Sequence, residues 1–388
     1  MRLAGIVAEF NPFHNGHKYI IDCAKCDGFA VACVISGNFV QRGDCAIIPK
    51  FKRAQTALEA GVDIVCELPV PWSMSTAQNF AFGSISQLAA LGIDTLYFGS
   101  ECGNFDLLNQ VSNLLLSKEF ENAIKQGLNS GETYAKIRQN IVLNLLGEEA
   151  SNTLQNPNDT LGIEYISAAK KLGLNLNFVP IKRIGAGHND KETVNSFSSS
   201  SFIRKKVLNG DYDGLSTIMP ECSLKVLSNS PIANISKIDT AIVSKIKQMS
   251  LEEIKSLPDL SEGMENLIFS AARKEHTYQD LCNAIKSKRY TMARIRRILL
   301  SGFLGIEKGF FNYPPPYVRI LGFTNNGLVL LPKNSKTPII TRVSQINDLN
   351  DFSKKVFKTE MQANELYSLS LSNPKLYINE QKEKIIKK

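Results

Sequence analysis

Short apolar runs alternate with helical stretches through the first 210 residues, and this alternation constrains the fold more than any other feature of the chain. Strands are expected at 3–8, 30–35, 64–67, 95–98 and 176–181, and helices at 18–25, 51–60, 77–91, 160–172 and 199–209. Strands that alternate with helices of this length form a parallel sheet with both faces covered. The first part of the chain is therefore predicted to be an α/β domain built on a parallel sheet.

The second half of the chain is mainly helical and basic. Residues 251–303 have helical periodicity, and 286–297 concentrate Lys and Arg. Residues 1–200 hold 16 Lys and Arg against 19 Asp and Glu, whereas the rest holds 29 against 18. This asymmetry predicts a polyanionic partner, although a solubilising surface with a Lys-rich tail would give the same counts. We expect an α/β domain over 1–215 and a mainly helical, basic C-terminal domain with a small β portion over 216–388.

Several local patterns refine this division. The turn Asn325-Asn326-Gly327 separates the apolar runs 317–323 and 327–331, which predicts a β-hairpin. The charged tail 381–388 is expected to fray. No run of about 18 apolar residues exists, so no membrane span is expected, and polar residues near position 10 exclude a signal peptide. The eight cysteines are then expected to be reduced thiols in a cytoplasmic protein.

The tetrapeptide His14-Asn15-Gly16-His17 joins the first predicted strand to the first predicted helix. The chain has only four histidines, so this HxGH spacing should arise by chance about 0.003 times. Open parallel sheets bind ligands at the carboxyl ends of their strands, where a helix N-terminus offers unpaired N–H groups. Gly16 lets a phosphate approach the backbone, and both histidines can donate to its oxygens. His14, His17 and the neighbouring Lys18 are therefore the candidate catalytic residues.

A second candidate element, Ser199-Ser200-Ser201, stands at a loop-to-helix junction. Serine hydroxyls cap helix N-termini and can also bind phosphate. Arg204 follows in the first turns of that helix, from where it could reach the β- or γ-phosphate of a nucleotide. Alone, the serine run fits a plain helix cap equally well, whereas beside HxGH it indicates a triphosphate site.

Together, HxGH and the run Ser199-Ser200-Ser201-Phe202-Ile203-Arg204 resemble the HxGH nucleotidyltransferase superfamily. Its members bind ATP or CTP in a Rossmann-like fold and cleave between the α- and β-phosphates. Further runs are similar to those of the bacterial tRNA(Met) cytidine acetate ligase family: GIVAEFNPFHNGH, SGNFVQRGD, GVDIVCELP, FGSE, PNDTLGIEY, IKRIGAGH and YPPPYVRILGF. Ser198 and Ser201 depart mildly from the superfamily pattern, in which an apolar residue and Thr are common there.

The resemblance implies a two-step reaction. Acetate attacks the α-phosphate of ATP, which releases pyrophosphate and forms acetyladenylate. The exocyclic amine of the wobble cytidine of elongator tRNA(Met) then takes the acetyl group, giving N4-acetylcytidine. Mg²⁺ is expected to accompany ATP, although no acidic cluster has metal-ligand spacing and no protein metal ligand is predicted.

Three alternatives stay open from the residues alone. A small-molecule adenylyl- or cytidylyltransferase would use the same site chemistry, and the long basic second half counts against it. A relative of the class I aminoacyl-tRNA synthetases would carry lysine in the second motif, where this chain has Ser199-Ser200-Ser201. A nucleotide-sensing, non-catalytic RNA-binding protein is disfavoured by the intact histidines and Gly16.

The resemblance also implies the residues of the site. ATP would be cradled by the segment Val7, Ala8, Glu9, Phe10, Asn11, Pro12, Phe13, His14, Asn15, Gly16, His17, Lys18, Tyr19 and Ile20. Gly99, Asn158 and Arg183 would contact the nucleotide. Ser199, Ser200, Ser201 and Arg204 would close over the triphosphate.

Other residues have two interpretations each. Arg42 and Asp44 could hold acetate or a tRNA phosphate, or form a structural pair in a loop. Glu101 could bind a metal or ribose, or cap a helix. His188 could lie at the rim of the site or in a plain loop. The basic stretch 286–297 could contact tRNA, although on a helix its charges would not all share one face.

Overall fold

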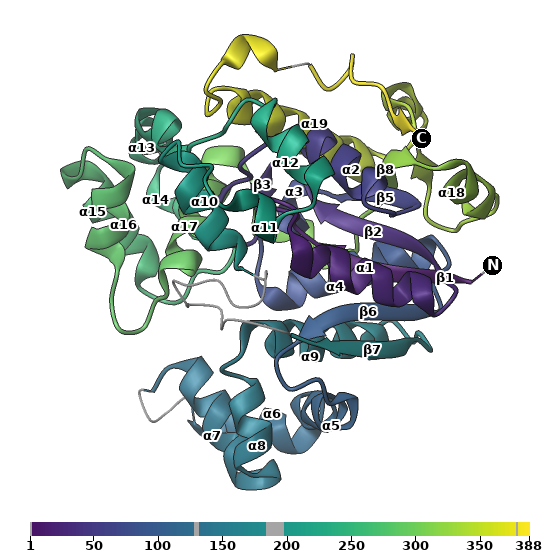
Figure 1. Cartoon of the computed structure of the whole chain (residues 1–388). Coiled ribbons are helices and arrows are strands. Elements are labelled where there is room, and N and C mark those ends of the chain that lie inside the picture. Colours follow the sequence, from purple (N-terminus) through teal and green to yellow (C-terminus); the bar gives the residue numbers. More distant parts are fainter. Residues whose placement is uncertain (1, 128–131, 184–197, 378) are drawn as a thin grey trace.

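A central sheet carries the fold, with helices on both of its faces (Figure 1). This computed structural model describes residues 2–127, 132–183, 198–377 and 379–388. The strands follow the order β10-β8-β5-β2-β1-β6-β7, with β9 beside β8, and β5–β8 is the only antiparallel pair of this sheet among the described residues. Their bounds are β1 (Leu3–Ala8), β2 (Ala30–Ser36), β5 (Ile64–Leu68), β6 (Thr95–Ser100), β7 (Asn177–Lys182), β8 (Val318–Phe323), β9 (Ile339–Ile340) and β10 (Ile386–Lys387). The predicted α/β class and mostly parallel sheet are confirmed.

Strand β2 shows why the sheet needs cover on both faces, because all seven of its residues are buried. Ala32 and Val34 belong to one core cluster, together with helices α4 and α9, whereas Cys33 and Ile35 belong to a second, with α1 and α2. The helices that cover the sheet or follow its strands are α1 (Asn15–Cys26), α2 (Lys50–Glu59), α3 (Val70–Ser73), α4 (Ala77–Ala90), α9 (Pro157–Lys171) and α10 (Ser200–Leu208). A short pair, β3 (Phe39–Val40) and β4 (Asp44–Cys45), follows β2. Successive side chains along β2 thus point to opposite faces of the sheet and pack into two separate cores.

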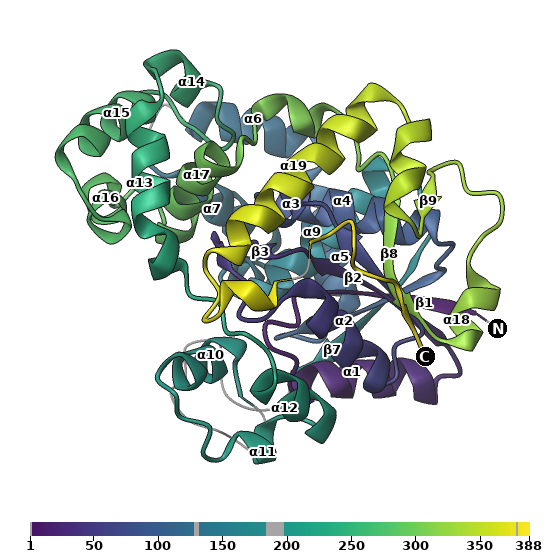
Figure 2. The ribbon, with the colours of Figure 1, turned by 90° about the horizontal axis from the view of Figure 1, so that it is seen from above.

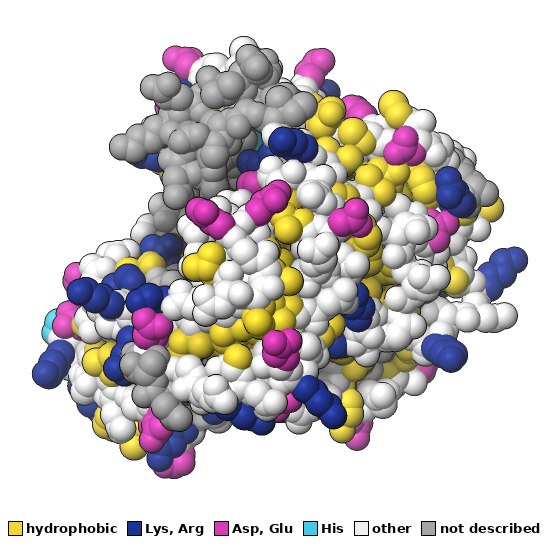
Figure 3. Space-filling view, turned by 90° about the horizontal axis from the view of Figure 1, so that it is seen from below, with side chains coloured by type: hydrophobic (Ala, Val, Ile, Leu, Met, Phe, Trp, Pro, Cys, Tyr) yellow, Lys and Arg dark blue, Asp and Glu magenta, His cyan; other side chains and the backbone are white. Residues whose placement is uncertain are grey.

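Four further helices are inserted between β6 and α9: α5 (Phe105–Leu115), α6 (Lys118–Gly127), α7 (Tyr134–Leu146) and α8 (Glu148–Thr153). They lie together below the sheet in Figure 1. Figure 3 views the molecule from that side and shows hydrophobic side chains between scattered charges of both signs. Such a mixed face differs from the concentrated positive charge that a polyanion favours.

The second half of the chain is largely helical, as predicted. Its helices are α11 (Leu215–Ile218), α12 (Glu221–Ser228), α13 (Asp239–Gln248), α14 (Leu251–Lys255), α15 (Met264–Lys274), α16 (Tyr278–Ile285), α17 (Met292–Leu304), α18 (Asn325–Leu330) and α19 (Asp351–Ser368). Helices α13 to α17 form one group beside the sheet in both Figure 1 and Figure 2. No helix among the described residues is long and apolar enough to cross a bilayer. All eight cysteines are free, in agreement with the expected thiols.

The predicted hairpin at 317–331 is wrong, because the residues after β8 form helix α18. Thr324 caps this helix, and its hydroxyl accepts the backbone N–H of Gly327 at 3.1 Å. A Cβ added at Gly327 would lie 2.1 Å from the carbonyl oxygen of Asp63. Gly327 therefore permits a close approach of two backbones, and it does not form a hairpin turn.

The tail does not fray, which corrects the second prediction for this region. Strand β10 pairs with β8, and Lys388 donates its backbone N–H to the carbonyl of Phe323 at 3.0 Å. The prediction rested on the charged residues of the tail and overlooked the apolar Ile385 and Ile386, which pack against the core clusters. The β portion predicted after residue 216 thus joins the central sheet, across the domain division predicted at residue 215.

Five charged side chains are buried where α2, β5, β8, α19 and the tail meet. Lys50 contacts Glu67, Glu360 at 3.2 Å and Glu380 at 2.9 Å. Arg319 contacts Glu380 at 2.6 Å and Glu67 at 3.4 Å. Burial, followed by the neighbouring Glu360, raises the pKa of Glu67. We call these five residues the buried charge cluster; it ties α19 and the tail to the sheet.

Candidate active site

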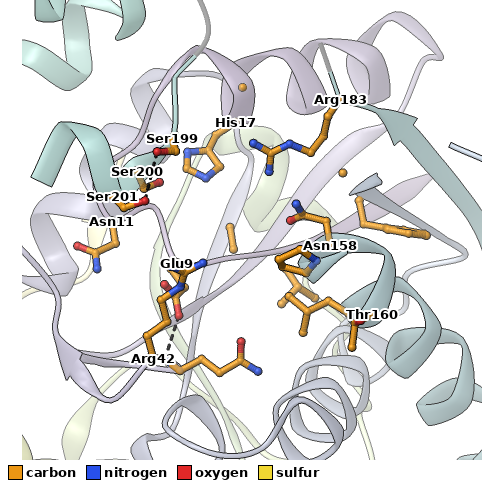
Figure 4. A pocket seen from close by; sticks show the side chains of 18 of the residues that line it. Glu9, Asn11, His17, Arg42, Asn158, Thr160, Arg183, Ser199, Ser200 and Ser201 are labelled. Atoms are coloured by element: carbon orange, nitrogen blue, oxygen red, sulfur yellow. Dashed lines mark hydrogen bonds between the residues drawn. The ribbon is translucent and has the colours of Figure 1, made fainter. Parts of the chain in front are cut away.

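A cavity of about 720 Å³ lies at the carboxyl ends of β1 and β6 (Figure 4). It brings together most residues of the predicted site: Val7, Ala8, Glu9, Asn11, His14, Gly16, His17, Tyr19, Ile20, Gly99, Asn158, Arg183, Ser199, Ser200, Ser201 and Arg204. Further lining residues that were not predicted for the nucleotide site include several from α4, α9 and α17: Ala77, Phe80, Thr160, Leu161, Tyr165, Ala293 and Arg297. Apolar walls with a few convergent polar groups are typical of a small-molecule site.

The two histidines of HxGH form a reciprocal cap at the start of α1. The Nδ1 atom of His14 accepts the backbone N–H of Gly16 at 3.1 Å, and Nδ1 of His17 accepts the N–H of His14 at 3.2 Å. Their rings stack with centroids 3.8 Å apart. Phe10 and Phe13 are buried and pack against the His17 ring at 5.1 Å and 5.6 Å. This packing fixes both imidazoles at the N-terminus of α1.

These hydrogen bonds also set the tautomer of each histidine. Because Nδ1 accepts in both rings, a neutral imidazole must carry its proton on Nε2. Burial, with Arg183 and Arg204 nearby, lowers the pKa of His14 to about 3. Burial and the adjacent His14 lower the pKa of His17 well below its ordinary value. Both residues are therefore neutral Nε2–H donors near neutral pH.

This assignment predicts how the two histidines respond to pH. ¹⁵N NMR spectra should show the Nε2–H tautomer for His14 and His17, with no titration between pH 5 and 8. An unfolded chain protonates its histidines near pH 6.5, whereas the folded one keeps this pair neutral. The pair's contribution to stability is therefore complete above pH 6.5. It falls by up to about 1.4 kcal/mol per pH unit for each histidine as the pH drops below that value. A titration midpoint near 6.5 for either residue would refute the assignment.

Some predicted residues of the first loop do not line the cavity. Lys18, a predicted catalytic residue, forms an ion pair with Asp22 on the outer side of α1. Asn15 donates from its side chain to the carbonyl of Thr217 at 3.0 Å. Phe10 and Phe13 support His17 from the core, and Pro12 is also absent from the cavity wall.

Arg53 holds the loops that build the site, a role that the sequence analysis did not predict. It is buried, and its guanidinium donates to the carbonyls of Glu9 at 2.6 Å and Ser36 at 2.9 Å, and also to Gly37. Burial lowers the pKa of Arg53 to about 10. The side chain thus connects the carboxyl ends of β1 and β2 and satisfies carbonyls that the strands leave unpaired.

Glu101 caps helix α9, which agrees with one of its two predicted roles. Its carboxylate accepts the side-chain N–H of Asn158 at 2.7 Å and the backbone N–H of Asp159 at 2.9 Å. Asp159, which is buried, accepts in turn from the Ser100 hydroxyl and the N–H of Glu101. This network joins the end of β6 to α9 and turns Asn158 toward the cavity (Figure 4).

The serine run begins helix α10 beside the HxGH loop. The Ser199 hydroxyl accepts the N–H of Phe202 at 3.3 Å and lies 3.2 Å from the Ser201 hydroxyl. Arg204 donates to the carbonyl of Asn11 at 2.7 Å, and burial lowers its pKa. The Ser198 hydroxyl is buried without a partner among the described residues. Arg204 therefore links the run to the loop after β1 while lining the cavity.

The basic stretch 286–297 divides into two parts. Arg294 and Arg297 are half-buried and both contact Asp259, and Arg297 also reaches the carbonyl of Gln41 at 3.4 Å. Lys288 and Arg289, before α17, are exposed. Arg297 thus attaches α17 to the loop after β2, and the first part of the stretch is more exposed to solvent than the second.

The remaining candidates are placed as follows. Arg42 lines the cavity, and Asp44 accepts the backbone N–H of Cys45 at 2.8 Å. Burial raises the pKa of Asp44. His188 lies outside the described residues. Within the part of the chain that the structure describes, no group of three His, Cys, Asp or Glu could hold a metal ion.

The chain is similar to known proteins over nearly its whole length. A family described as HIGH Nucleotidyl Transferase matches residues 1–384. The tRNA(Met) cytidine acetate ligase of Thermoanaerobacter sp. (strain X514) is 38% identical over 389 residues, 96% of this chain and 96% of its own. That of Clostridium perfringens (strain SM101 / Type A) is 36% identical over 98% of this chain and 97% of its own.

Two solved structures extend the likeness to three dimensions. The crystal structure of apo Thermotoga maritima TmcAL superposes with a TM-score of 0.94 at 30% identity, covering 100% of this chain and 99% of that one. The structure of the same protein bound with alpha-thio ATP gives a TM-score of 0.92 at 30% identity, with the same coverage.

Proposed function

The chain belongs to the HIGH nucleotidyl transferase family, and we propose that it is an ATP-dependent ligase that acetylates the wobble cytidine of elongator tRNA(Met). Acetate is activated as acetyladenylate, and its acetyl group passes to the cytidine N4. The observation that carries the proposal is the reciprocal histidine cap at the start of α1, in which both Nδ1 atoms accept backbone N–H groups, inside a cavity large enough for a nucleotide.

The proposed chemistry of the first step follows from charge. As acetate attacks the α-phosphate and pyrophosphate leaves, negative charge grows on the phosphate oxygens. His14, His17, Arg183 and Arg204 line the cavity, and we propose that the Nε2–H groups of the two histidines, the N-terminus of α1 and the two guanidiniums face the phosphate on which that charge develops. Donors that are already oriented stabilise such a transition state without further reorganisation.

Mg²⁺ finds no ready-made protein site in the described cavity. Glu9 is the one carboxylate that lines it among the described residues, and a hard cation prefers several oxygen ligands. We therefore propose that any Mg²⁺ enters with ATP and is held mainly by phosphate oxygens, and we assign no step to it.

The proposed tRNA partner is a polyanion, so it should meet the exposed basic residues of the second half. Lys286, Lys288 and Arg289 are exposed just before α17, whose first turn lines the cavity. Phosphate contacts supply much of the affinity for nucleic acids and would hold the tRNA near the cavity mouth. A tRNA substrate also fits a cytoplasmic location.

Two substitutions at Gly99 test where the nucleotide lies in the cavity. A Cβ at Gly99 would meet Ile20 at 3.5 Å and Arg183 at 3.9 Å, which are ordinary contacts, so Gly99→Ala should fold and bind ATP within threefold of the parent. A leucine side chain would extend into the cavity, so Gly99→Leu should weaken ATP binding at least tenfold by calorimetry. Equal ATP affinity for both variants would place the nucleotide elsewhere.

The function is tested by incubating purified bacterial tRNA with the protein, ATP and radiolabelled acetate, without acetyl-CoA. Labelled N4-acetylcytidine after nucleoside digestion is the expected result. If tRNA stays unlabelled while pyrophosphate is released with small metabolites, the chain is a small-molecule nucleotidyltransferase and the proposal fails.

A further inference from the structure

The cavity has two ends with different chemistry. Figure 4 shows Arg183 and Asn158 together on one side, whereas Glu9 and Arg42 lie on the other. Helix α17 also contributes to the cavity, through Ala293 and Arg297, and the Arg297 guanidinium donates to the carbonyl of Gln41. The side of the cavity that carries Glu9 is thus the one connected to the basic second half of the chain.

Glu9 is held in place there. Its carbonyl accepts from Arg53 at 2.6 Å, and its Oε1 atom accepts the backbone N–H of Gln41 at 2.9 Å. No other hydrogen bond to this carboxylate occurs within the described parts of the chain. A half-buried carboxylate with one oxygen fixed and one open is well placed to accept a hydrogen from a bound molecule.

Acetyl transfer releases a proton, and Glu9 is the best-placed group to take it. The Nδ1 atoms of His14 and His17 accept backbone N–H groups, so neither ring offers an open basic nitrogen. The other described ionisable groups of the cavity wall are cationic side chains and the phenols Tyr19 and Tyr165. Burial raises the pKa of Tyr165, which keeps it protonated. Glu9 is the only carboxylate among the described lining residues.

We propose that Glu9 is a catalytic residue of the second step: it accepts the hydrogen bond of the cytosine N4 amine and then its proton. This inference rests on the proposed function. The N4–carbonyl bond forms, the bond between the acetyl carbon and the phosphate oxygen breaks, and AMP leaves with that electron pair. The N4 proton passes to Glu9 and then to solvent. Carboxylates are the side chains that read cytosine through its N4 donor, so the same contact selects cytosine.

The test separates the two half-reactions in the full-length protein. Acetate-dependent exchange of labelled pyrophosphate into ATP measures adenylate formation, and N4-acetylcytidine in tRNA measures transfer. Hydroxylamine, a nucleophile that needs no enzymatic base, traps acetyladenylate as a hydroxamate. The variants are Glu9→Gln, which keeps size and removes charge, and the control Glu59→Gln, at an exposed glutamate on α2.

In Glu9→Gln, the ratio of transfer to exchange should fall at least 100-fold, because general bases contribute about 10²- to 10⁴-fold. Hydroxamate formation and tRNA binding should persist, and Glu59→Gln should match the parent. The proposal is overturned if exchange falls as much as transfer, or if transfer stays within threefold of the parent. An absence of acetate-dependent exchange in the parent would instead contradict the proposed function.

Discussion

Replacing His17 by alanine is expected to lower the rate of acetate-dependent pyrophosphate exchange at least 100-fold. The substitution removes an Nε2–H donor from the cavity and also the Nδ1 acceptor of the His14 N–H. Loss of a single oriented donor to a developing oxyanion typically reduces rates by about 10²- to 10³-fold. Here the loss also frees the stacked ring of His14, so the effect should lie at the upper end of that range.

Two controls make this result specific. His276→Ala changes an exposed histidine outside the cavity and should exchange pyrophosphate like the parent. Binding of tRNA to His17→Ala, measured by filter retention, should stay within threefold of the parent, because His17 lines the cavity, whereas the proposed phosphate contacts are made by the exposed residues Lys286, Lys288 and Arg289. A variant that forms adenylate normally yet fails to bind tRNA would contradict the assignment of HxGH to nucleotide chemistry.

Replacing Lys50 by methionine should lower the free energy of unfolding by about 3–5 kcal/mol, the largest stability effect that we expect. Lys50 contacts all three glutamates of the buried charge cluster. Without it, Arg319 alone faces Glu67, Glu360 and Glu380. Removing one partner from a buried ionic group leaves uncompensated charge away from water, and solvent cannot replace the lost contact.

Urea denaturation followed by circular dichroism measures this effect. The double variant Lys50→Met with Glu360→Gln should be more stable than Lys50→Met alone, because one fewer buried carboxylate then lacks a cation. Lys125→Met, in an exposed ion pair with Glu121, should unfold at the same urea concentration as the parent. If Lys50→Met also unfolds at the same urea concentration as the parent, the buried charge cluster does not stabilise the fold.

Local patterns predicted the sheet and the HxGH loop well, for identifiable reasons. Buried parallel strands such as β2 are continuous apolar runs, and a strand followed by HxGH and a helix leaves little choice of geometry. Arg53 could not be assigned from its neighbours, because a basic residue in an amphipathic helix usually faces solvent. Its burial depends on carbonyls of Glu9 and Ser36, which only the folded chain brings near it.

Long-range contacts explain the remaining differences. Gly327 resembled a turn residue, and its real constraint is the carbonyl of Asp63, far away in the sequence. The contribution of Arg297 to the cavity depends on how the α13–α17 group packs against the loop after β2, and no local signal encodes that packing. Helices α5 to α8, which lie between β6 and α9, were not predicted, because that segment carries none of the motifs on which the predictions rested. Lys18 shows the opposite case, since its place beside HxGH suggested a role although its side chain pairs with Asp22.

The pairing of β5 with β8 has a consequence for how the protein is made. Glu67 in β5 and Arg319 in β8 are 252 residues apart. At about 5–20 residues per second, a ribosome needs roughly 13–50 seconds to supply the missing neighbour. Throughout that time β5 has an open edge of Ile64, Val65 and Cys66, and such edges pair readily with other chains. The yield of folded protein should therefore depend on chaperones that cover nascent strands, and refolding in vitro should be limited by aggregation at high protein concentration.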